Sequence, residues 1–269
     1  MKEQLFWVFG ILIVISLTDC RKKAGEIEES QKGKEIWIQL FNGKDLTNWK
    51  AKIKGYPLGE NFANTFRVEE GKIVVDYRDY DAFENRFGHL FYDIPFSSYR
   101  LRMKYRFVGS QAKGGEAWAT KNSGVMIHSQ AAESMRIDQD FPVSVEVQLL
   151  GGLKKGELRP TANLCSPGTH VVMNDTLVTE HCVNSSSETF YGDEWVDLEL
   201  LVYGDSLIVH FVNEKEVLRY SKPLIGGEYN ELEEKEGSSL NYGYIALQSE
   251  SHPIEFKSIE LMNLKDQKN

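Results

Sequence analysis

The sequence contains few cysteines, few prolines and no apolar run long enough to span a bilayer well. Of its 269 residues, three are cysteine and seven are proline. The longest apolar run, residues 5–15, is well below the roughly 20 residues that a transmembrane helix needs. The net charge is −9, and the basic residues do not form a stripe along the sequence. This charge argues against nucleic acids and anionic lipid surfaces as partners.

Motifs of several enzyme classes are also missing. The sequence has no G-x-S-x-G elbow, no H-E-x-x-H, no phosphate loop and no G-x-G-x-x-G. Serine hydrolases, zincins, and nucleotide-binding or dinucleotide-binding enzymes therefore have no support. A retaining glycosidase needs two neighbouring carboxyl groups. The strand predicted around Glu146 offers only Ser144 and Gln148 on the same face, which argues against an ordinary glycosidase.

The N-terminus predicts export. Lys2 precedes the apolar run 5–15, and Leu17-Thr18-Asp19-Cys20 resembles a lipobox, although Asp19 replaces the usual small residue. We expect residues 1–20 to be a lipoprotein signal peptide, with Cys20 lipidated as the mature N-terminus. The alternative is an uncleaved anchor helix. Either kind of N-terminus places the protein in a bacterial cell envelope, facing the periplasm or the cell surface. The N-terminal anchor would be its only contact with the membrane.

The rest of the chain divides into a tether and one domain. Residues 21–34 are charged and nearly devoid of large apolar side chains, so they predict a flexible tether. Residues 35–265 predict a single domain. Apolar and polar residues alternate with period two, or form short apolar runs between turns, in residues 72–77, 99–107, 195–203, 206–212, 216–220, 243–248 and 254–261. This pattern, without helical periodicity, predicts an all-β sandwich or barrel.

Two polar regions interrupt the strands, at residues 111–122 and 151–189, and long loops on a β scaffold commonly carry function. The second region contains Cys165 and Cys182, which we expect to form a disulfide in an oxidising compartment. A metal site made with His170 and His181 is a weaker alternative, because the close ligand pairs of structural zinc sites are missing. The acidic stretch 228–237 is interpreted as a solvated loop without function.

Three predicted strands carry polar side chains on the face opposite the core. Strand alternation places Asn122 and His128 of the first strand on this face. Glu146 and Gln148 of the second strand and Gln248 of the third share it. These residues suit either the floor of a cleft that binds hydroxyl groups or an ordinary wet sheet face. Four residues at loop positions are candidates to cap one end of the cleft: Lys121, Arg136, His170 and His181.

Five segments resemble motifs of the 3-keto-disaccharide hydrolase family, and together they cover about residues 35–264. They are LFNGKDLTNW (40–49), NSGV (122–125), VEVQLL (145–150), GYIALQ (243–248) and IEFKSI (254–259). The resemblance implies a concanavalin A-like jelly-roll β-sandwich of two antiparallel sheets. Family members are often lipoproteins of sugar-degrading bacteria, and those with an assigned activity cleave glycosides oxidised at C3. Residues 165–195 resemble a family branch with a Cys-bracketed insertion.

The resemblance also implies a mechanism and a ligand, a glycoside or oligosaccharide. A C3 ketone acidifies the C2 proton, so one base, Glu146, suffices for β-elimination. His128, Gln148 or Arg136 would stabilise the enolate, and a histidine would protonate the leaving group. No cofactor is certain. A divalent metal, calcium or a transition metal, held by Glu146 and His128, is an alternative enolate stabiliser. Non-catalytic glycan binding in the same cleft, or a structural adhesion role, remain alternative functions.

The N-terminal prediction can be tested by fractionation. If Cys20 carries lipid, Cys20→Ser should move the protein from the membrane fraction to the soluble envelope fraction. A wild-type protein that is already soluble would contradict lipidation and leave only export.

Overall fold

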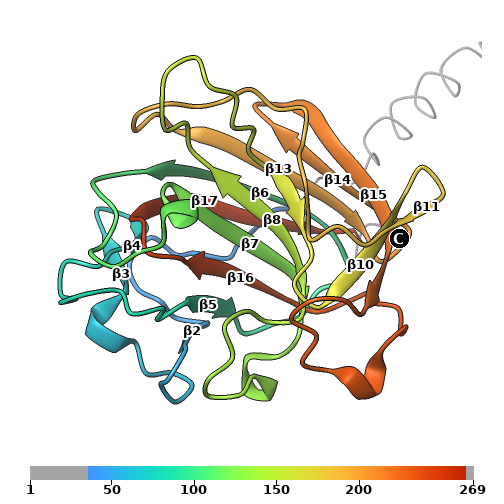
Figure 1. Cartoon of the computed structure of the whole chain (residues 1–269), viewed down its shortest axis with the longest axis horizontal. Helices are drawn as coiled ribbons and strands as arrows, with labels where there is room; N and C mark the ends of the chain where they lie inside the picture. The colour runs from blue at the N-terminus through green and yellow to red at the C-terminus, as the bar shows by residue number, and fades with distance from the viewer. Residues whose placement is uncertain (1–35, 265–269) are drawn as a thin grey trace, which may run out of the picture. The chain divides into compact units, whose positions relative to one another are not determined.

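The computed structural model describes residues 36–264, which form two antiparallel β-sheets packed face to face (Figure 1). The all-β prediction and the two-sheet jelly-roll architecture are confirmed. The predicted signal peptide 1–20, lipidated Cys20 and tether 21–34 lie outside the described residues.

The larger sheet has ten strands in the order β11-β10-β15-β14-β13-β6-β17-β4-β3, with β1 paired to β17. Its central neighbours β6, β13 and β17 pair over long antiparallel registers. The predicted strands 195–203, 206–212 and 216–220 are present as β13, β14 and β15, which form an antiparallel meander. The strands are β1 (Ile38–Gln39), β3 (Phe66–Glu69), β4 (Lys72–Val75), β6 (Ser98–Phe107), β10 (Thr169–Met173), β11 (Thr176–Val178), β13 (Val196–Tyr203), β14 (Leu207–Val212), β15 (Lys215–Ile225) and β17 (Ile254–Asn263).

The smaller sheet has seven strands in the order β12-β9-β8-β7-β16-β5-β2. They are β2 (Trp49–Ile53), β5 (Gly88–Tyr92), β7 (Asn122–Ser129), β8 (Val145–Leu150), β9 (Asn163–Cys165), β12 (Cys182–Val183) and β16 (Tyr244–Ser249). The helices of the described region are single 3₁₀ turns: η1 (Phe62–Asn64), η2 (Ala117–Ala119), η3 (Ala132–Ser134) and η4 (Glu233–Lys235). No helix within residues 36–264 has the length and apolarity needed to cross a membrane.

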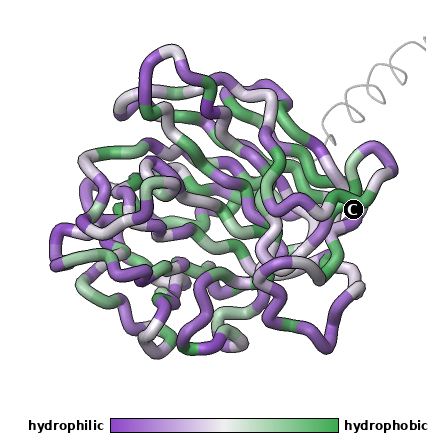
Figure 2. Tube along the Cα trace, in the orientation of Figure 1, coloured by the Kyte–Doolittle hydropathy of each residue, from purple (hydrophilic) through white to green (hydrophobic). Residues whose placement is uncertain are grey.

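The core lies between the two sheets because each strand turns one side chain in two toward the other sheet. In β6, Leu101, Met103 and Tyr105 are buried in this core. The intervening residues face outward, and Lys104, for example, forms an exposed ion pair with Asp197 at 2.5 Å. Exposed ion pairs contribute about 0–1 kcal/mol each, so burial of the apolar row holds the strand in register. Figure 2 shows this separation, with hydrophobic segments along the strands and hydrophilic ones in the loops.

The seven-stranded sheet is buried on both faces near β7, where every residue from Asn122 to Ser129 is buried. The predicted core-facing residues Val125, Ile127 and Val147 do lie in the core. On the opposite face, a second apolar cluster forms around Met126. It consists of Phe91, Met126, Ala132, Met135 and Ala246. The second face is therefore not a plain wet surface.

The segment 151–189, expected to be an irregular excursion, contains four short strands. Strands β9 and β12 extend the seven-stranded sheet, and β10 and β11 extend the ten-stranded sheet. Cys165 of β9 lies directly opposite Cys182 of β12, with a Cα–Cα distance of 4.2 Å, and the two form the predicted disulfide. The bond joins the edge strand β12 to β9, and it rules out the metal-site alternative that used both cysteines.

The disulfide predicts a measurable loss of stability when it is removed. The bond closes a loop between residues 17 positions apart, and chain entropy assigns about 3 kcal/mol of stabilisation to a loop of this size. Replacing both cysteines by serine should lower the midpoint of chemical unfolding accordingly. The wild-type protein, kept without reductant, should resist alkylation at both cysteines. Full alkylation of both cysteines in the unreduced protein would contradict the bond.

Candidate functional site

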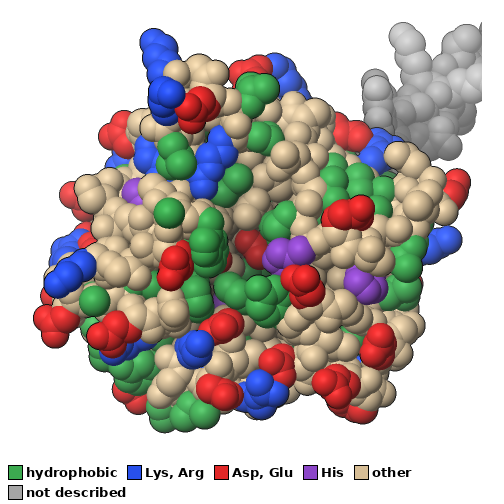
Figure 3. All heavy atoms as spheres, in the orientation of Figure 1, with side chains coloured by type: hydrophobic (Ala, Val, Ile, Leu, Met, Phe, Trp, Pro, Cys, Tyr) green, Lys and Arg blue, Asp and Glu red, His purple; other side chains and the backbone are tan. Residues whose placement is uncertain are grey.

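A cavity of about 450 Å³ opens on the face of the seven-stranded sheet that points away from the core. Figure 3 shows this face hollowed, with hydrophobic, acidic and histidine side chains around the hollow. The lining residues come from β7, β8, β9, β12 and the loops that follow neighbouring strands. They are Asn85, Phe87, Glu116, Trp118, Asn122, Asp140, Phe141, Glu146, Gln148, Cys165, Pro167, His181, Cys182, Tyr229 and Glu250.

Glu146 projects from β8 onto this face, as strand alternation predicted. In the sheet it lies between Met126 of β7 and Cys165 of β9. Its carboxyl group covers Gly124, and a Cβ atom on Gly124 would lie 2.6 Å from Glu146 Oε1. The carboxyl can occupy this place only because Gly124 has no side chain, which gives the N-S-G-V segment a role in positioning Glu146.

Glu250 contributes a second carboxyl group to the same cavity. It follows the last residue of β16, and a hydrogen-bonded frame fixes the residues on both sides of it. The Tyr77 hydroxyl contacts Ser249 Oγ and accepts from the Ser251 backbone N–H, both at 2.9 Å. Gln111 Nε2 also donates to Ser251 Oγ at 2.9 Å. The backbone that carries Glu250 is therefore rigid.

The two carboxyl groups are almost fully removed from water, since Glu146 is 6% exposed and Glu250 is 4% exposed. Burial raises the pKa of Glu146 to about 8. Burial, together with the charge of Glu146, raises the pKa of Glu250 well above its ordinary value, and Arg159 opposes this only in part. Burial disfavours the charged form of each acid. Each acid therefore keeps its proton to a higher pH than a free carboxyl group does.

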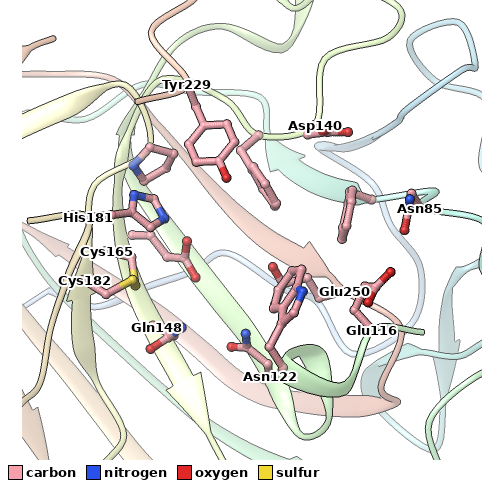
Figure 4. Close-up of a pocket in the computed structure, with 15 residues that line it drawn as sticks. Asn85, Glu116, Asn122, Asp140, Gln148, Cys165, His181, Cys182, Tyr229 and Glu250 are labelled. Atoms are coloured by element: carbon pink, nitrogen blue, oxygen red, sulfur yellow. A yellow bond between two sulfur atoms is a disulfide. The ribbon is translucent and has the colours of Figure 1, made fainter. Parts of the chain in front are cut away.

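Two amides form the polar floor beside this pair (Figure 4). Asn163 Nδ2 donates to Gln148 Oε1 at 3.1 Å, which orients the Gln148 amide so that its nitrogen can donate toward a ligand. Asn122 is 4% exposed, and its Oδ1 is buried without a hydrogen-bond partner among the described residues. Both residues were predicted for the site, and both line the cavity.

An aromatic arc forms the opposite wall of the cavity, and we use this name for Trp118, Phe87, Phe141, Tyr229 and His181. Successive ring centroids lie 6.2, 5.1, 5.5 and 5.4 Å apart in that order. Trp118 remains 52% exposed at the end of the arc. Tyr229 belongs to the acidic stretch 228–237, so one residue of that predicted solvated loop lines the cavity.

His181 is the one predicted histidine that reaches the cavity. It precedes Cys182, and its backbone oxygen accepts from the Ser166 N–H at 2.9 Å, so the disulfide and this bond fix its position. Burial lowers the pKa of His181, and Glu228 opposes the shift only in part. The ring is therefore neutral at neutral pH, and its Nδ1 has no partner among the described residues.

The structure places His128 away from the site, so its assignment to the face of Asn122 was wrong. The register between β7 and β16 shifts between Tyr244 and Ala246, opposite Ile127 and His128. His128 has a φ of 48° at this bulge. An extra residue in one strand reverses the alternation of side chains. The His128 ring instead contacts the Gly204 carbonyl oxygen at 2.9 Å, and the predicted Glu146–His128 pair is not formed.

Four other candidates do not line the cavity either. Arg136 is exposed and pairs with Glu231, and Lys121 Nζ approaches the Gly152 oxygen at 3.5 Å. His170 packs against Gly227. Gln248 is fully buried, and both polar atoms of its side chain lack partners among the described residues. No group of three or more potential metal ligands occurs within residues 36–264, so these residues do not fit the proposed metal.

Sequence reasoning missed Glu250 and the aromatic arc. Glu250 was detectable in principle, because a strand that continued past Gln248 would place Gln248 and Glu250 on the same face. The search for a second acid stayed on the strand of Glu146, whereas the acid comes from the end of β16. The arc joins residues from separate loops and has no signature within a single segment.

The buried acids predict an unusual pH dependence of stability. Between the ordinary carboxyl value and about 8, folded Glu146 keeps a proton that the unfolded chain has released. The free energy of unfolding must therefore fall as pH rises through this window. Between pH 5 and 8, Glu146→Gln should therefore lose about 2–3 kcal/mol less of its free energy of unfolding than the wild type does. Urea unfolding at several pH values measures this free energy. The exposed control Glu70→Gln should keep the wild-type slope, and parallel curves for Glu146→Gln would contradict the burial effect.

Comparisons with known proteins give the family and the fold. A family model described as the 3-keto-alpha-glucoside-1,2-lyase-like domain matches residues 36–262. A crystal structure of a candidate glycosyl hydrolase from Parabacteroides distasonis ATCC 8503 is 15% identical and has a TM-score of 0.52, covering 85% of this chain and 100% of its own. Another from the same organism is 19% identical with a TM-score of 0.49, covering 89% and 97%. A search of curated proteins finds no significant match. The match over residues 36–262 shows that the chain belongs to the 3-keto-alpha-glucoside-1,2-lyase-like domain family.

Proposed function

We propose that this domain cleaves glycosides whose sugar carries a ketone at C3, with Glu146 as the base and Glu250 as the acid. The observation that carries the proposal is the pair of buried carboxyl groups in one cavity, both with raised pKa values. Paired acids whose environments separate their proton affinities are typical of acid–base sites. The family match and the candidate glycosyl hydrolases among the related structures support a carbohydrate substrate.

The reaction needs one base and one acid. The ketone acidifies the C2 proton, which transfers to Glu146 in its ionised form, and the electrons of the broken C–H bond form an enolate. The raised pKa means that this ionised form becomes abundant as pH approaches 8. When the enolate collapses, a double bond forms between C1 and C2, the C1–O bond breaks, and the leaving oxygen takes the proton of Glu250. The products are an unsaturated 3-keto-sugar and an alcohol. Addition of water to the double bond would complete a hydrolysis.

The remaining polar groups suit the enolate. Gln148 Nε2, oriented by Asn163, and the Asn122 amide can donate to the C3 oxygen as negative charge develops there. His181, neutral and beside Tyr229, replaces the predicted His128 as the histidine available to the substrate. We assign the role of base to Glu146 and the role of acid to Glu250, and the kinetic variants below test this division.

Ordinary glycoside hydrolysis is the second candidate, and Glu250 is the observation in its favour. The sequence argued against this reaction because no second acid shared the strand of Glu146. Since the cavity contains two carboxyl groups, that argument no longer holds. Glycan binding without turnover uses the same cavity and the same aromatic arc. The substrate panel below separates all three functions.

The acid–base roles predict different kinetic effects for the two glutamates. Glu146→Gln should lower kcat on 3-keto-glycosides by about 10²–10⁴-fold, because the amide keeps its place but cannot accept the proton. Glu250→Gln should lower kcat similarly for alkyl leaving groups but much less for 4-nitrophenol, which leaves without protonation. Glu70→Gln is the control and should retain wild-type rates.

Product release from oxidised and parent glycosides provides the measurement. We expect 3-keto-glycosides to be cleaved and their unoxidised parents to remain intact. Equal rates on both would replace the proposal with ordinary hydrolysis. Binding of both without any product would leave only a glycan-binding role.

A further inference from the structure

The cavity is lined by acids without a basic partner among the lining residues. Four carboxyl groups border it, from Glu116, Asp140, Glu146 and Glu250, and no lysine or arginine does. Lys54 pairs with Asp140 at 2.6 Å from outside the lining. A ligand in the cavity therefore faces three further carboxyl groups, as Figure 4 shows for Glu116 and Glu250.

Arg159 acts on Glu250 from outside the lining, and its guanidinium is already engaged. Its Nη1 donates to the Gly151 oxygen at 2.6 Å and to the Lys121 oxygen at 3.1 Å. These bonds hold the arginine to the backbone, so it does not offer a charge to the substrate. An anionic ligand would find no cation among the lining residues to pair with.

Two buried acceptors in the lining lack donors. Asn122 Oδ1 and Glu250 Oε2 have no hydrogen-bond partner among the described residues, and each residue is 4% exposed. Buried polar atoms are almost always paired in native proteins. Asn122 is not an acid, so its unpaired oxygen is independent of the acidic lining, and it too calls for a ligand that donates hydrogen bonds.

The aromatic arc adds a surface that attracts cations. The faces of aromatic rings bear partial negative charge, and ammonium groups bind to them, most strongly where carboxyl groups lie nearby. Sugar rings also stack on aromatic side chains, so the arc alone does not choose between a neutral and a cationic substrate. The acidic lining and the two unpaired acceptors favour the cation.

We propose that the substrate of this cavity is an aminated glycoside, whose protonated amine lies between the acidic residues and the aromatic arc and donates to Asn122 Oδ1 and Glu250 Oε2. The inference rests on the proposed function, since it names the substrate class of the same site. Uronic acids and sulfated sugars are excluded by charge. Glu250 can accept this hydrogen bond at Oε2 and still keep the proton that its role as the acid requires.

Calorimetric titration with unoxidised glycosides tests the proposal without turnover. The probes are methyl 2-amino-2-deoxyglucoside, methyl 6-amino-6-deoxyglucoside, the N-acetylated forms of both, methyl glucoside and methyl glucuronide. We expect at least one aminated glycoside to bind about tenfold more tightly than methyl glucoside, as one charge-assisted contact would give. Acetylation and high salt should remove the gain.

Variants assign the preference to the cavity. Glu250→Gln should abolish most of the gain, and Glu116→Gln, at an exposed position where the fold is not at risk, should reduce it. Trp118→Leu should weaken binding of the amine through the arc, and the control Glu70→Gln should leave it unchanged. Equal affinity for amine and hydroxyl probes, tighter binding of methyl glucuronide, or no binding of either amine would overturn the proposal. Cleavage of neutral 3-keto-glycosides would survive any of these results.

Discussion

The site depends on one close approach, that of the Glu146 carboxyl group to the backbone of Gly124. Any other residue at position 124 would place a Cβ atom within 2.6 Å of the carboxyl oxygen. With glycine there, the carboxyl lies flat against the sheet, loses contact with water and acquires a raised pKa. The raised pKa of Glu146 therefore follows from burial between two neighbouring strands, without a charged partner.

The scaffold must stabilise this arrangement elsewhere, because burying two like acids opposes folding. The core between the sheets provides the stabilisation, since β6, β13 and β17 bury an apolar row along most of their length. Strand β7 belongs to both environments, with Val125 and Ile127 in the core and Asn122 and Gly124 on the cavity face. A rigid sheet holds the acids, and loops supply most of the aromatic arc, so the shape of the cavity can vary without disturbing the acid pair.

Strand positions, core faces and the place of Glu146 could be predicted because each depends on alternation within a single segment. His128 could not be placed, because its direction depends on a bulge defined by the register of β7 against β16. Its φ of 48° is unusual for a non-glycine residue and has no sequence signal here. Glu250 and Tyr229 reach the cavity from beyond the end of β16 and from an acidic loop, and only the tertiary arrangement brings them to Glu146.

The acid pair connects reactivity with selectivity. Two buried carboxyl groups with raised pKa values fit the proposed base and acid, and the same two groups, together with Glu116 and Asp140, give the cavity its acidic lining. Lys54 and Arg159 act from outside the lining, on Asp140 and Glu250. A lysine or arginine inside the cavity would lower the pKa of the acid that must keep its proton. The lining contains neither residue, so the pKa of Glu250 stays raised, as its proposed role as the acid requires.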